Sequence, residues 1–246
     1  MPVAAAALRA LDKLLETDAP ALRATLPATF DDAAERYVRL LLDANNRLNL
    51  TRIVEPDAVA RLHLLDTLSA LPLIDALAPR RALDLGSGGG VPGIILALAR
   101  PEMSWTLVDS VRKKADAMRG FAAELGLANV TVVAERAEVL GRDPAHRERY
   151  DLVAARACAA LPVLVEYGLP LLRDGGSLLA WKGAVADEEL RAGAAASRLL
   201  GGGEPESRDV AMTALGDHRL VLVRKMGPTP HGYPRRPGVP SRQPLG

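Results

Sequence analysis

A run of glycines directly after an apolar segment constrains this chain more than any other feature. Residues 82–93 read Ala-Leu-Asp-Leu-Gly-Ser-Gly-Gly-Gly-Val-Pro-Gly. Glycine permits positive φ angles and lets a ligand approach the backbone closely. A helix that begins at such a run points its free N–H groups at the same place. We therefore predict a strand, a ligand-binding turn and a helix, which is the start of an α/β fold.

The spacing of these glycines indicates which ligand the turn holds. Gly86, Gly88 and Gly90 alternate with other residues, whereas the dinucleotide fingerprint G-x-G-x-x-G requires a glycine where this chain has Val91. The difference favours a nucleoside without a pyrophosphate. S-adenosylmethionine is therefore the expected cofactor, and an NAD-dependent dehydrogenase is a distant alternative.

Length and composition favour one α/β domain with an extension. The chain has 246 residues, of which 49% are hydrophobic and 25% are charged. The single cysteine, Cys158, excludes an intramolecular disulfide and fits a reducing cytoplasm, and the four histidines lack metal-ligand spacing. The apolar N-terminus is interrupted at Arg9, and nothing approaches the roughly 18 apolar residues of a membrane span. We expect a cytoplasmic protein with no metal and no membrane segment.

The periodicity of apolar residues divides the chain into three parts. Residues 1–77 are expected to form a helical extension, residues 78–226 to alternate between strands and helices, and residues 227–246 to form a basic, proline-rich arm. The last two candidate strands are too close for a crossover helix, which predicts an antiparallel hairpin at one edge. The layout is that of a Rossmann-like class I methyltransferase: α/β, with a seven-stranded, mostly parallel sheet and an antiparallel last strand. The candidate strands are Ala82–Leu85, Trp105–Asp109, Val130–Ala134, Asp151–Ala155, Ser177–Trp181, Asp209–Met212 and His218–Val223.

Three acidic residues are placed to hold parts of such a cofactor. Asp109 ends the second strand about 20 residues after the glycines, where a doubly wound sheet places a carboxylate for two ribose hydroxyls. Asp84 ends the first strand and can bind a cationic amino group. After the third strand, Ala137 leaves room for a purine whose edge Glu138 can contact. The same residues also suit simpler roles, as a turn former, a cap for loop amides and an acid at a helix start.

Two basic residues end strands where a transferred methyl group would emerge. Because a buried arginine requires a partner, Arg156 would hold the cofactor carboxylate, a substrate phosphate or a guanine edge, or would form a structural ion pair. Lys182 is the weaker candidate, since many lysines at strand ends simply reach solvent. Packing explains His63 and a buried Cys158 better than catalysis, because neither has the neighbours of an activated nucleophile or a metal site.

The end of the chain is basic. No acidic residue follows Asp217, and five basic residues lie among six prolines from Arg224 onward. Such a segment suits phosphates as a partly extended arm, and a solvated, disordered tail fits its composition equally well.

A set of short motifs spans nearly the whole chain. They are Asn49-Leu50-Thr51, His63-Leu64-Leu65-Asp66-Thr67-Leu68, the glycine loop with its Pro92-Gly93, Val108-Asp109-Ser110, Arg112-Lys113-Lys114, Arg136-Ala137-Glu138, Arg156-Ala157, Trp181-Lys182-Gly183, His218-Arg219-Leu220-Val221 and 233–240. Together these motifs resemble the RsmG (GidB) family, methyltransferases that modify guanine N7 in bacterial 16S ribosomal RNA. The loop alone is typical of methyltransferases in general, and the Asn-Leu-Thr, Pro-Gly and Pro-Arg segments narrow the resemblance. The chain departs slightly from the residues usual in this family at Gly89, Thr67 and Cys158.

The resemblance implies a simple reaction on RNA by a monomer. Guanine N7 has a free lone pair and no proton, so positioning is required and a general base is not. Arg156 and Lys182 would orient the guanine or its phosphate as the catalytic residues. Because side chains cannot reach N7 easily in A-form RNA, the target in 16S rRNA or the small ribosomal subunit should be unpaired. RNA would bind to Arg112, Lys113, Lys114, Arg235 and Arg236. The expected cofactor-binding residues are Asp84, Gly86, Gly88, Gly90, Val91, Asp109, Ser110, Val111, Ala137, Glu138 and Arg156.

Two other functions remain open from the residues. A methyltransferase of a small molecule or a protein would keep every cofactor residue and lose the RNA role of the arm. A non-catalytic RNA-binding or assembly protein would be expected to have a damaged glycine loop or to lack Asp109, and this chain has neither change.

Overall fold

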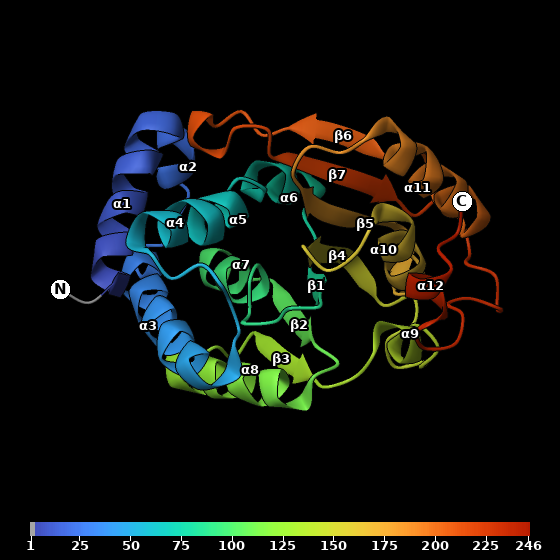
Figure 1. Cartoon of the computed structure of the whole chain (residues 1–246), viewed down its shortest axis with the longest axis horizontal. Helices are drawn as coiled ribbons and strands as arrows, with labels where there is room; N and C mark the ends of the chain where they lie inside the picture. The colour runs from blue at the N-terminus through green and yellow to red at the C-terminus, as the bar shows by residue number, and fades with distance from the viewer. Residues whose placement is uncertain (1–2) are drawn as a thin grey trace.

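The N-terminal part of the chain is helical, as its periodicity predicts. The computed structural model describes residues 3–246, so residues 1 and 2 of the expected extension lie outside the described range. Within that range, the N-terminal helices are α1 (Val3–Asp18), α2 (Pro20–Arg23), α3 (Phe30–Leu48), α4 (Pro56–Val59), the π-helical turn η1 (Ala60–Leu65), α5 (Asp66–Leu68) and α6 (Leu71–Leu77). Figure 1 shows α1 to α4 at one end of the molecule and the later N-terminal helices closer to its middle.

The rest of the chain builds a seven-stranded sheet in the order β3-β2-β1-β4-β5-β7-β6. The first five strands pair in parallel, and β7 is antiparallel to both of its neighbours, β5 and β6. The predicted fold class and the edge hairpin are therefore confirmed. The strands are β1 (Arg81–Leu85), β2 (Ser104–Val108), β3 (Val130–Val133), β4 (Tyr150–Arg156), β5 (Leu172–Lys182), β6 (Glu206–Asp209) and β7 (Arg219–Arg224). The intervening elements are α7 (Gly93–Ala99), α8 (Arg112–Leu125), α9 (Ala137–Leu140), α10 (Leu161–Gly168), α11 (Asp187–Leu199) and η2 (Thr213–Leu215).

The sixth strand differs from its prediction. The sequence predicted Asp209–Met212, and the observed strand β6 ends at Asp209. This strand is a largely exposed edge that reads Glu-Ser-Arg-Asp, so it has no buried face to create an apolar alternation. The apolar residues that suggested a strand lie instead in the connection to η2.

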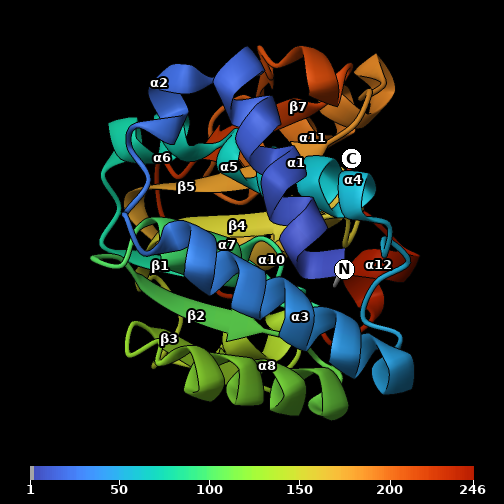
Figure 2. The ribbon, with the colours of Figure 1, turned by 90° about the vertical axis from the view of Figure 1, so that its left-hand side faces the viewer.

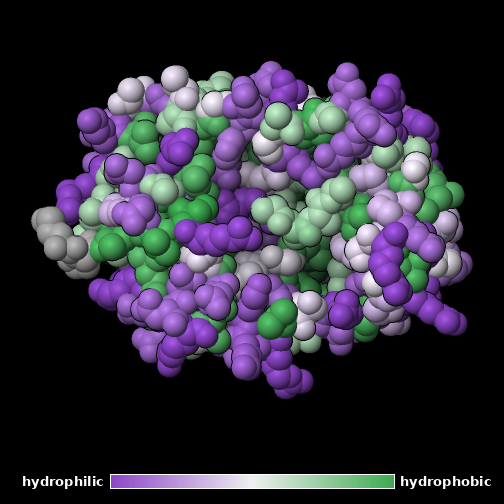
Figure 3. Space-filling model, viewed as in Figure 1, coloured by the Kyte–Doolittle hydropathy of each residue, from purple (hydrophilic) through white to green (hydrophobic). Residues whose placement is uncertain are grey.

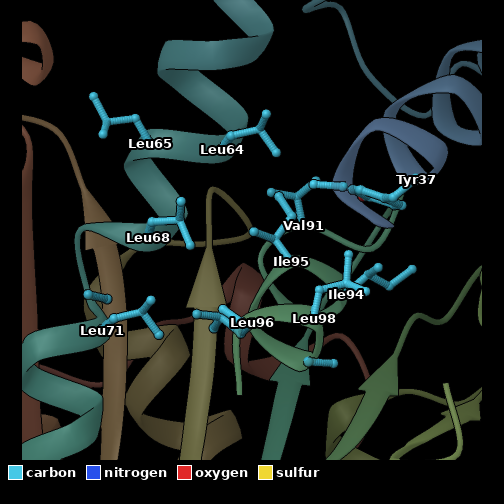
Figure 4. Packing of buried hydrophobic residues seen from close by; sticks show 14 of the residues in the cluster. Tyr37, Leu64, Leu65, Leu68, Leu71, Val91, Ile94, Ile95, Leu96 and Leu98 are labelled. Carbon is cyan, nitrogen blue, oxygen red and sulfur yellow. The ribbon is translucent and has the colours of Figure 1, made fainter. Parts of the chain in front are cut away.

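Side chains alternate between two apolar layers, one on each face of the sheet. On β1, Ala82 packs with the N-terminal helices, α7 and α8, whereas Leu83 and Leu85 pack with α10 and α11. This period of two is what a strand covered on both faces requires. Figure 4 shows the first layer, where Leu64, Leu68 and Ile95 belong to one cluster that joins the N-terminal helices to α7.

The N-terminal helices are built into this core. Figure 2 shows α1 and α3 in front of the sheet, with α3 beside α8. The buried Tyr37 hydroxyl on α3 donates a hydrogen bond to the carbonyl oxygen of Gly89 at 2.9 Å. The helical extension thus supports the glycine loop directly.

The C-terminal segment, residues 228–246, folds back against the body beside α9 and α10, and we call it the strap (Figure 1). It contains the short helix α12 (Val239–Arg242), and Pro234 and Pro240 are buried in the interface. The structure differs here from both the extended arm and the disordered tail that the composition suggested.

Candidate functional site

The loop after β1 takes a conformation that requires glycine. Gly86, Gly88 and Gly90 have φ angles of +69°, +58° and +96°, values that side-chain-bearing residues rarely adopt. At Gly86 a Cβ atom would also lie 3.0 Å from the Cβ atom of Cys158. The loop therefore has the positive φ angles that the sequence predicted, and its backbone is exposed at Gly86.

Asp109 fixes this loop to the end of β2. Its Oδ2 accepts a hydrogen bond from the N–H of Gly88 at 3.0 Å, and its Oδ1 accepts one from the N–H of Val111 at 2.8 Å. A carboxylate has about four lone-pair positions, so two remain for a ligand. The loop-capping role and the predicted ribose-binding role are compatible at this residue.

Asp84 is fully buried beneath the loop. Its Oδ2 accepts a hydrogen bond from the N–H of Gly93 at 3.0 Å, while its Oδ1 is buried without a hydrogen-bond partner. Burial raises the pKa of Asp84 to about 7, although the hydrogen bond from Gly93 opposes this shift. The free oxygen can accept from an ammonium group or a water molecule, which would restore the lower pKa.

A cavity of about 190 Å³ opens beside the glycine loop at the carboxyl edge of the sheet. Of the predicted cofactor residues, Gly86, Ser110, Ala137 and Glu138 line it. Gly88, Gly90, Val91, Asp109 and Val111 belong to the loops next to it, Asp84 lies in β1, and Arg156 lines a different cavity. The lining residues are Leu85, Gly86, Val108, Ser110, Glu135, Arg136, Ala137, Glu138, Cys158 and Tyr167.

Two residues of this cavity were missed by sequence reasoning. Cys158 was expected to be buried, but it is exposed in the loop after β4 and lines the cavity. Tyr167 comes from α10, and its hydroxyl lies 3.5 Å from Oε1 of Glu138. Neither residue belongs to a recognisable motif, because the fold brings them to the cavity from other strands and helices.

A second cavity, of about 250 Å³, contains Arg156 and Lys182. Figure 3 shows a hollow near the middle of the surface between the N-terminal helices and the α10–α12 side. The two cavities adjoin through one segment, since Arg156 and Ala157 line the second cavity and Cys158 lines the first. The residues of the second cavity are Ile53, Leu62, Asp66, Arg156, Ala157, Trp181, Lys182, Gly183 and His218.

Arg156 is held by three groups of η1 and its neighbourhood. Its Nη1 donates to Oδ2 of Asp66 at 3.2 Å and to the carbonyl oxygen of Leu62, and its Nη2 donates to Nδ1 of His63 at 3.1 Å. The side chain is only 15% exposed. Arg156 thus forms a structural ion pair and also lines the second cavity, whereas the sequence left an ion pair and a ligand contact as alternatives.

His63 is buried, as expected, and serves to orient Arg156. Burial and then the Arg156 charge lower the pKa of His63 to about 4, so the ring is neutral at physiological pH. Because arginine can only donate, Nδ1 of His63 accepts and Nε2 carries the proton. That proton is directed to Oγ1 of Thr51 at 2.9 Å. The Asn-Leu-Thr motif is therefore joined to Arg156 through His63.

Asp66 connects the same network to the last strand. Its Oδ1 lies 2.8 Å from Nδ1 of His218, which precedes β7, and its carbonyl oxygen accepts a hydrogen bond from Nε1 of Trp181 at 2.9 Å. His218 is 31% exposed and is the more accessible side chain. Sequence reasoning did not give a site role to Asp66, Trp181 or His218, although each lies in a motif that was recognised.

Lys182 also has its charge matched. Its Nζ donates to Oε1 of Glu189 at 2.7 Å and to the carbonyl oxygen of Ala159 at 2.9 Å. The side chain is 15% exposed. Lys182 therefore lies at the wall of the second cavity with its ammonium group already neutralised.

The predicted RNA-binding residues fall into two groups. Arg112 and Lys113 are exposed and Lys114 is half-buried in the first turn of α8, where the helix dipole disfavours cations. In the strap, Arg236 is exposed, whereas Arg235 forms an ion pair with the fully buried Glu166. The guanidinium of Arg235 is thus committed to the fold, contrary to the expectation of an exposed RNA contact.

No helix of residues 3–246 is long and apolar enough to cross a membrane. The same residues contain no cluster of three histidine, cysteine or acidic side chains that could hold a metal ion.

Solved structures with a similar fold include methyltransferases. An O-methyltransferase from Bacillus cereus, solved in complex with SAH, matches with a TM-score of 0.53 and 19% identity over 77% of this chain and 90% of that chain. The O-methyltransferase TomG from Streptomyces achromogenes, in complex with SAM, matches with a TM-score of 0.52 and 18% identity over 78% and 90%. At these identities the comparison shows the shared fold.

Sequence comparison shows the family. The model of the GidB family, rRNA small subunit methyltransferase G, matches residues 31–211. The chain is 48% identical to ribosomal RNA small subunit methyltransferase G of Deinococcus deserti over 84% of this chain and 85% of the relative. It is 37% identical to the protein of that name from Moorella thermoacetica over 97% and 100%. This chain belongs to the GidB family of rRNA small subunit methyltransferases.

Proposed function

We propose that this protein transfers a methyl group from its cofactor to N7 of a guanine in 16S rRNA of the small ribosomal subunit. The observation that carries this proposal is the pair of adjoining cavities on either side of residues 156–158. The first cavity lies beside the glycine loop and suits the cofactor. The second cavity is lined by Arg156 and Lys182 and suits the methyl-accepting base.

S-adenosyl-L-methionine is the cofactor of this chain, as its family and fold imply. These residues fit the cofactor. Asp84 has a buried carboxylate oxygen without a partner, and a side chain at position 86 would be too close to Cys158. Asp84 would hold the amino group, Asp109 the ribose, and Ala137 and Glu138 the adenine. When bound, this cofactor supplies a methyl group on a sulfonium centre.

The reaction at guanine N7 needs little acid–base chemistry from the protein. N7 has an in-plane lone pair and no proton to remove, so the protein acts by placing N7 in line with the methyl group. Arg156, fixed by Asp66 and His63, would orient the base or its phosphate, with Lys182 as a second cation at the wall. A rigid guanidinium loses little freedom on binding, which favours this role.

The RNA is proposed to contact cations at the carboxyl edge of the sheet. Arg112, Lys113 and Lys114 begin α8 directly after β2, against the unfavourable helix dipole, and an external phosphate would relieve that repulsion. Arg236 is free to contribute from the strap, whereas Arg235 is not. Because N7 is inaccessible in A-form RNA, the target guanine is proposed to be unpaired.

The alternatives are a methyltransferase of small molecules or proteins and a non-catalytic assembly factor. The family assignment disfavours both. We propose that the enzyme acts as a monomer in the cytoplasm, where small ribosomal subunits are available.

One experiment separates these functions. Purified protein is incubated with methyl-labelled S-adenosylmethionine and either small-subunit particles or naked 16S rRNA from a strain that lacks the protein. We expect N7-methylguanine in a digest of the 16S rRNA from at least one of the two substrates. Label that appears in other molecules only, or in no product at all, would contradict the proposal.

A further inference from the structure

The strap is attached to the body by an ion pair with a buried acid. The Glu166 side chain on α10 is 0% exposed. The Arg235 guanidinium donates to Oε1 at 2.9 Å and to Oε2 at 2.6 Å, and the Arg235 backbone N–H donates to Oε1 at 2.8 Å. Removal of the arginine would leave a buried carboxylate without its counter-charge, which is strongly unfavourable.

Two further arginines hold the strap backbone beside α9. Arg142 donates to the carbonyl oxygens of Pro234 and Gly232, at 2.8 and 2.9 Å. Arg147 donates to the carbonyl oxygens of Tyr233 and Thr229, both at 2.9 Å. A Cβ atom on Gly141 would lie 2.8 Å from Cγ of Pro234, so the strap is in close contact with the body at this point.

The docked strap contacts one residue of the first cavity directly and a second one through it. The N–H of Gly238 donates to Oε1 of Glu138 at 2.7 Å. The hydroxyl of Tyr167 lies 3.5 Å from the same Oε1 of Glu138, so the strap, Glu138 and Tyr167 are in series. The orientation of Glu138 therefore depends on a segment that lies 100 residues further along the chain, and Tyr167 depends on that segment through Glu138.

We propose that the strap is part of the cofactor-binding apparatus, because it positions Glu138 and Tyr167 and so sets the affinity for S-adenosylmethionine. Arg235 is a positioning residue that acts through the docked strap. The inference rests on the cofactor occupying the cavity beside the glycine loop, and it does not depend on which base of which RNA is methylated.

Binding linkage gives the proposal a second consequence. If a docked strap strengthens cofactor binding, then bound cofactor must strengthen strap docking by the same factor. The strap would therefore be more firmly closed in the cofactor-bound enzyme, and its exposed Arg236 would be presented to RNA mainly in that state.

The first test compares adjacent arginines. The dissociation constant for S-adenosylhomocysteine is measured by calorimetry for the wild type, Arg235→Ala, Arg236→Ala and a chain that ends at residue 232. We expect Arg235→Ala and the shortened chain to bind about tenfold more weakly or worse, and Arg236→Ala to remain within about twofold of the wild type. Unchanged affinity in the folded Arg235→Ala variant would overturn the proposal.

A second test uses the wild-type protein, so it does not depend on the folding of any variant. Amide hydrogen exchange of the strap is followed with and without saturating S-adenosylhomocysteine. We expect slower exchange in residues 233–242 when the ligand is bound, and equal rates would overturn the proposal. Failure of rRNA methylation with these binding results intact would instead contradict the proposed function alone.

Discussion

The two adjoining cavities are built in different ways. The first takes its walls mainly from segments that directly follow β1, β2, β3 and β4, and the glycine loop beside it covers a carboxylate oxygen of Asp84 that lacks a partner. The second draws on the N-terminal helices, on β4 and β5, and on His218 before β7, and the charges of Arg156 and Lys182 are already paired. A polar atom without a partner thus lies next to the first cavity, whereas the charges of the second cavity are paired within the protein.

The difference indicates how each cavity works. An unpaired buried carboxylate beside a cavity makes the binding of a cationic ligand more favourable, because the ligand's charge offsets the desolvation cost of that carboxylate. A cavity with paired charges is preorganised, so its cations need not be repositioned when a base arrives. Variants in the first cavity should therefore change cofactor affinity, and variants in the second should change turnover.

The largest effect is expected for Gly86→Val. The substitution places a branched side chain at a φ of +69° and within 3.0 Å of Cys158. We expect binding of S-adenosylhomocysteine to fall by about 100-fold or more in calorimetry, with methyl transfer lost. Gly120→Ala on α8, where an added Cβ meets no atom within 4 Å, is the matched control and should bind normally.

The next effect tests whether Arg156 belongs to the acceptor side. Arg156→Lys keeps a positive charge and loses the planar contacts to Leu62, His63 and Asp66. We expect turnover with small-subunit RNA to fall by about 100-fold, a size typical of a lost preorganised contact. Affinity for S-adenosylhomocysteine should stay within about threefold, and a parallel loss of both quantities would place Arg156 with the cofactor.

A smaller effect is expected at His218. Its ring is held by Asp66 and is the more exposed polar group of the second cavity. His218→Ala should lower turnover by about tenfold, a typical result of losing one hydrogen bond to a charged group, and should leave cofactor affinity unchanged. His231→Ala, an exposed histidine of the strap, serves as the control. Equal effects of the two substitutions would remove His218 from the site.

A last prediction concerns stability in place of function, because Asp84 should make the free energy of unfolding depend on pH. Its pKa is about 7 in the folded protein, against an ordinary value of 3.8. Between these values the folded state binds the extra proton, so this residue makes the free energy of unfolding decrease as pH rises. In the absence of cofactor, Asp84→Asn should gain about 3 kcal/mol relative to wild type between pH 4 and pH 7.

This comparison is made by urea unfolding of both proteins across that pH range. Because His63 has a lowered pKa and contributes in the opposite direction, only the difference between the two proteins isolates Asp84. A difference that is flat with pH would show that folding does not raise the pKa of Asp84. The same variant should bind S-adenosylhomocysteine more weakly.

The sequence predicted the local parts of the molecule well. The glycine loop, the parallel strands and the final hairpin all follow from patterns within short windows, and each is present. Strand β6 was misplaced because an exposed edge has no apolar alternation to detect. The errors and omissions at the site have a different cause, which is the distance in sequence between partners.

Arg235 illustrates this second cause. By composition it is one cation in a basic tail, and nothing near it in the sequence identifies its partner Glu166, which lies 69 positions earlier. In the same way, Asp66 and His218 are 152 positions apart, and their contact depends on β7 pairing with β5. A single sequence contains no signal for these contacts, because they are set by the fold as a whole.

The position of β7 near the end of the sequence also has a consequence for folding during synthesis of the chain. Protein chains emerge from the N-terminus, and domains begin to fold during synthesis. A nascent chain that has emerged only to residue 200 already contains β1 to β5 and the glycine loop, but it lacks His218, the strand that follows it and the strap. The unfinished chain thus has the framework of a cofactor cavity without a complete place for a base, which would delay the first methyl transfer until synthesis ends.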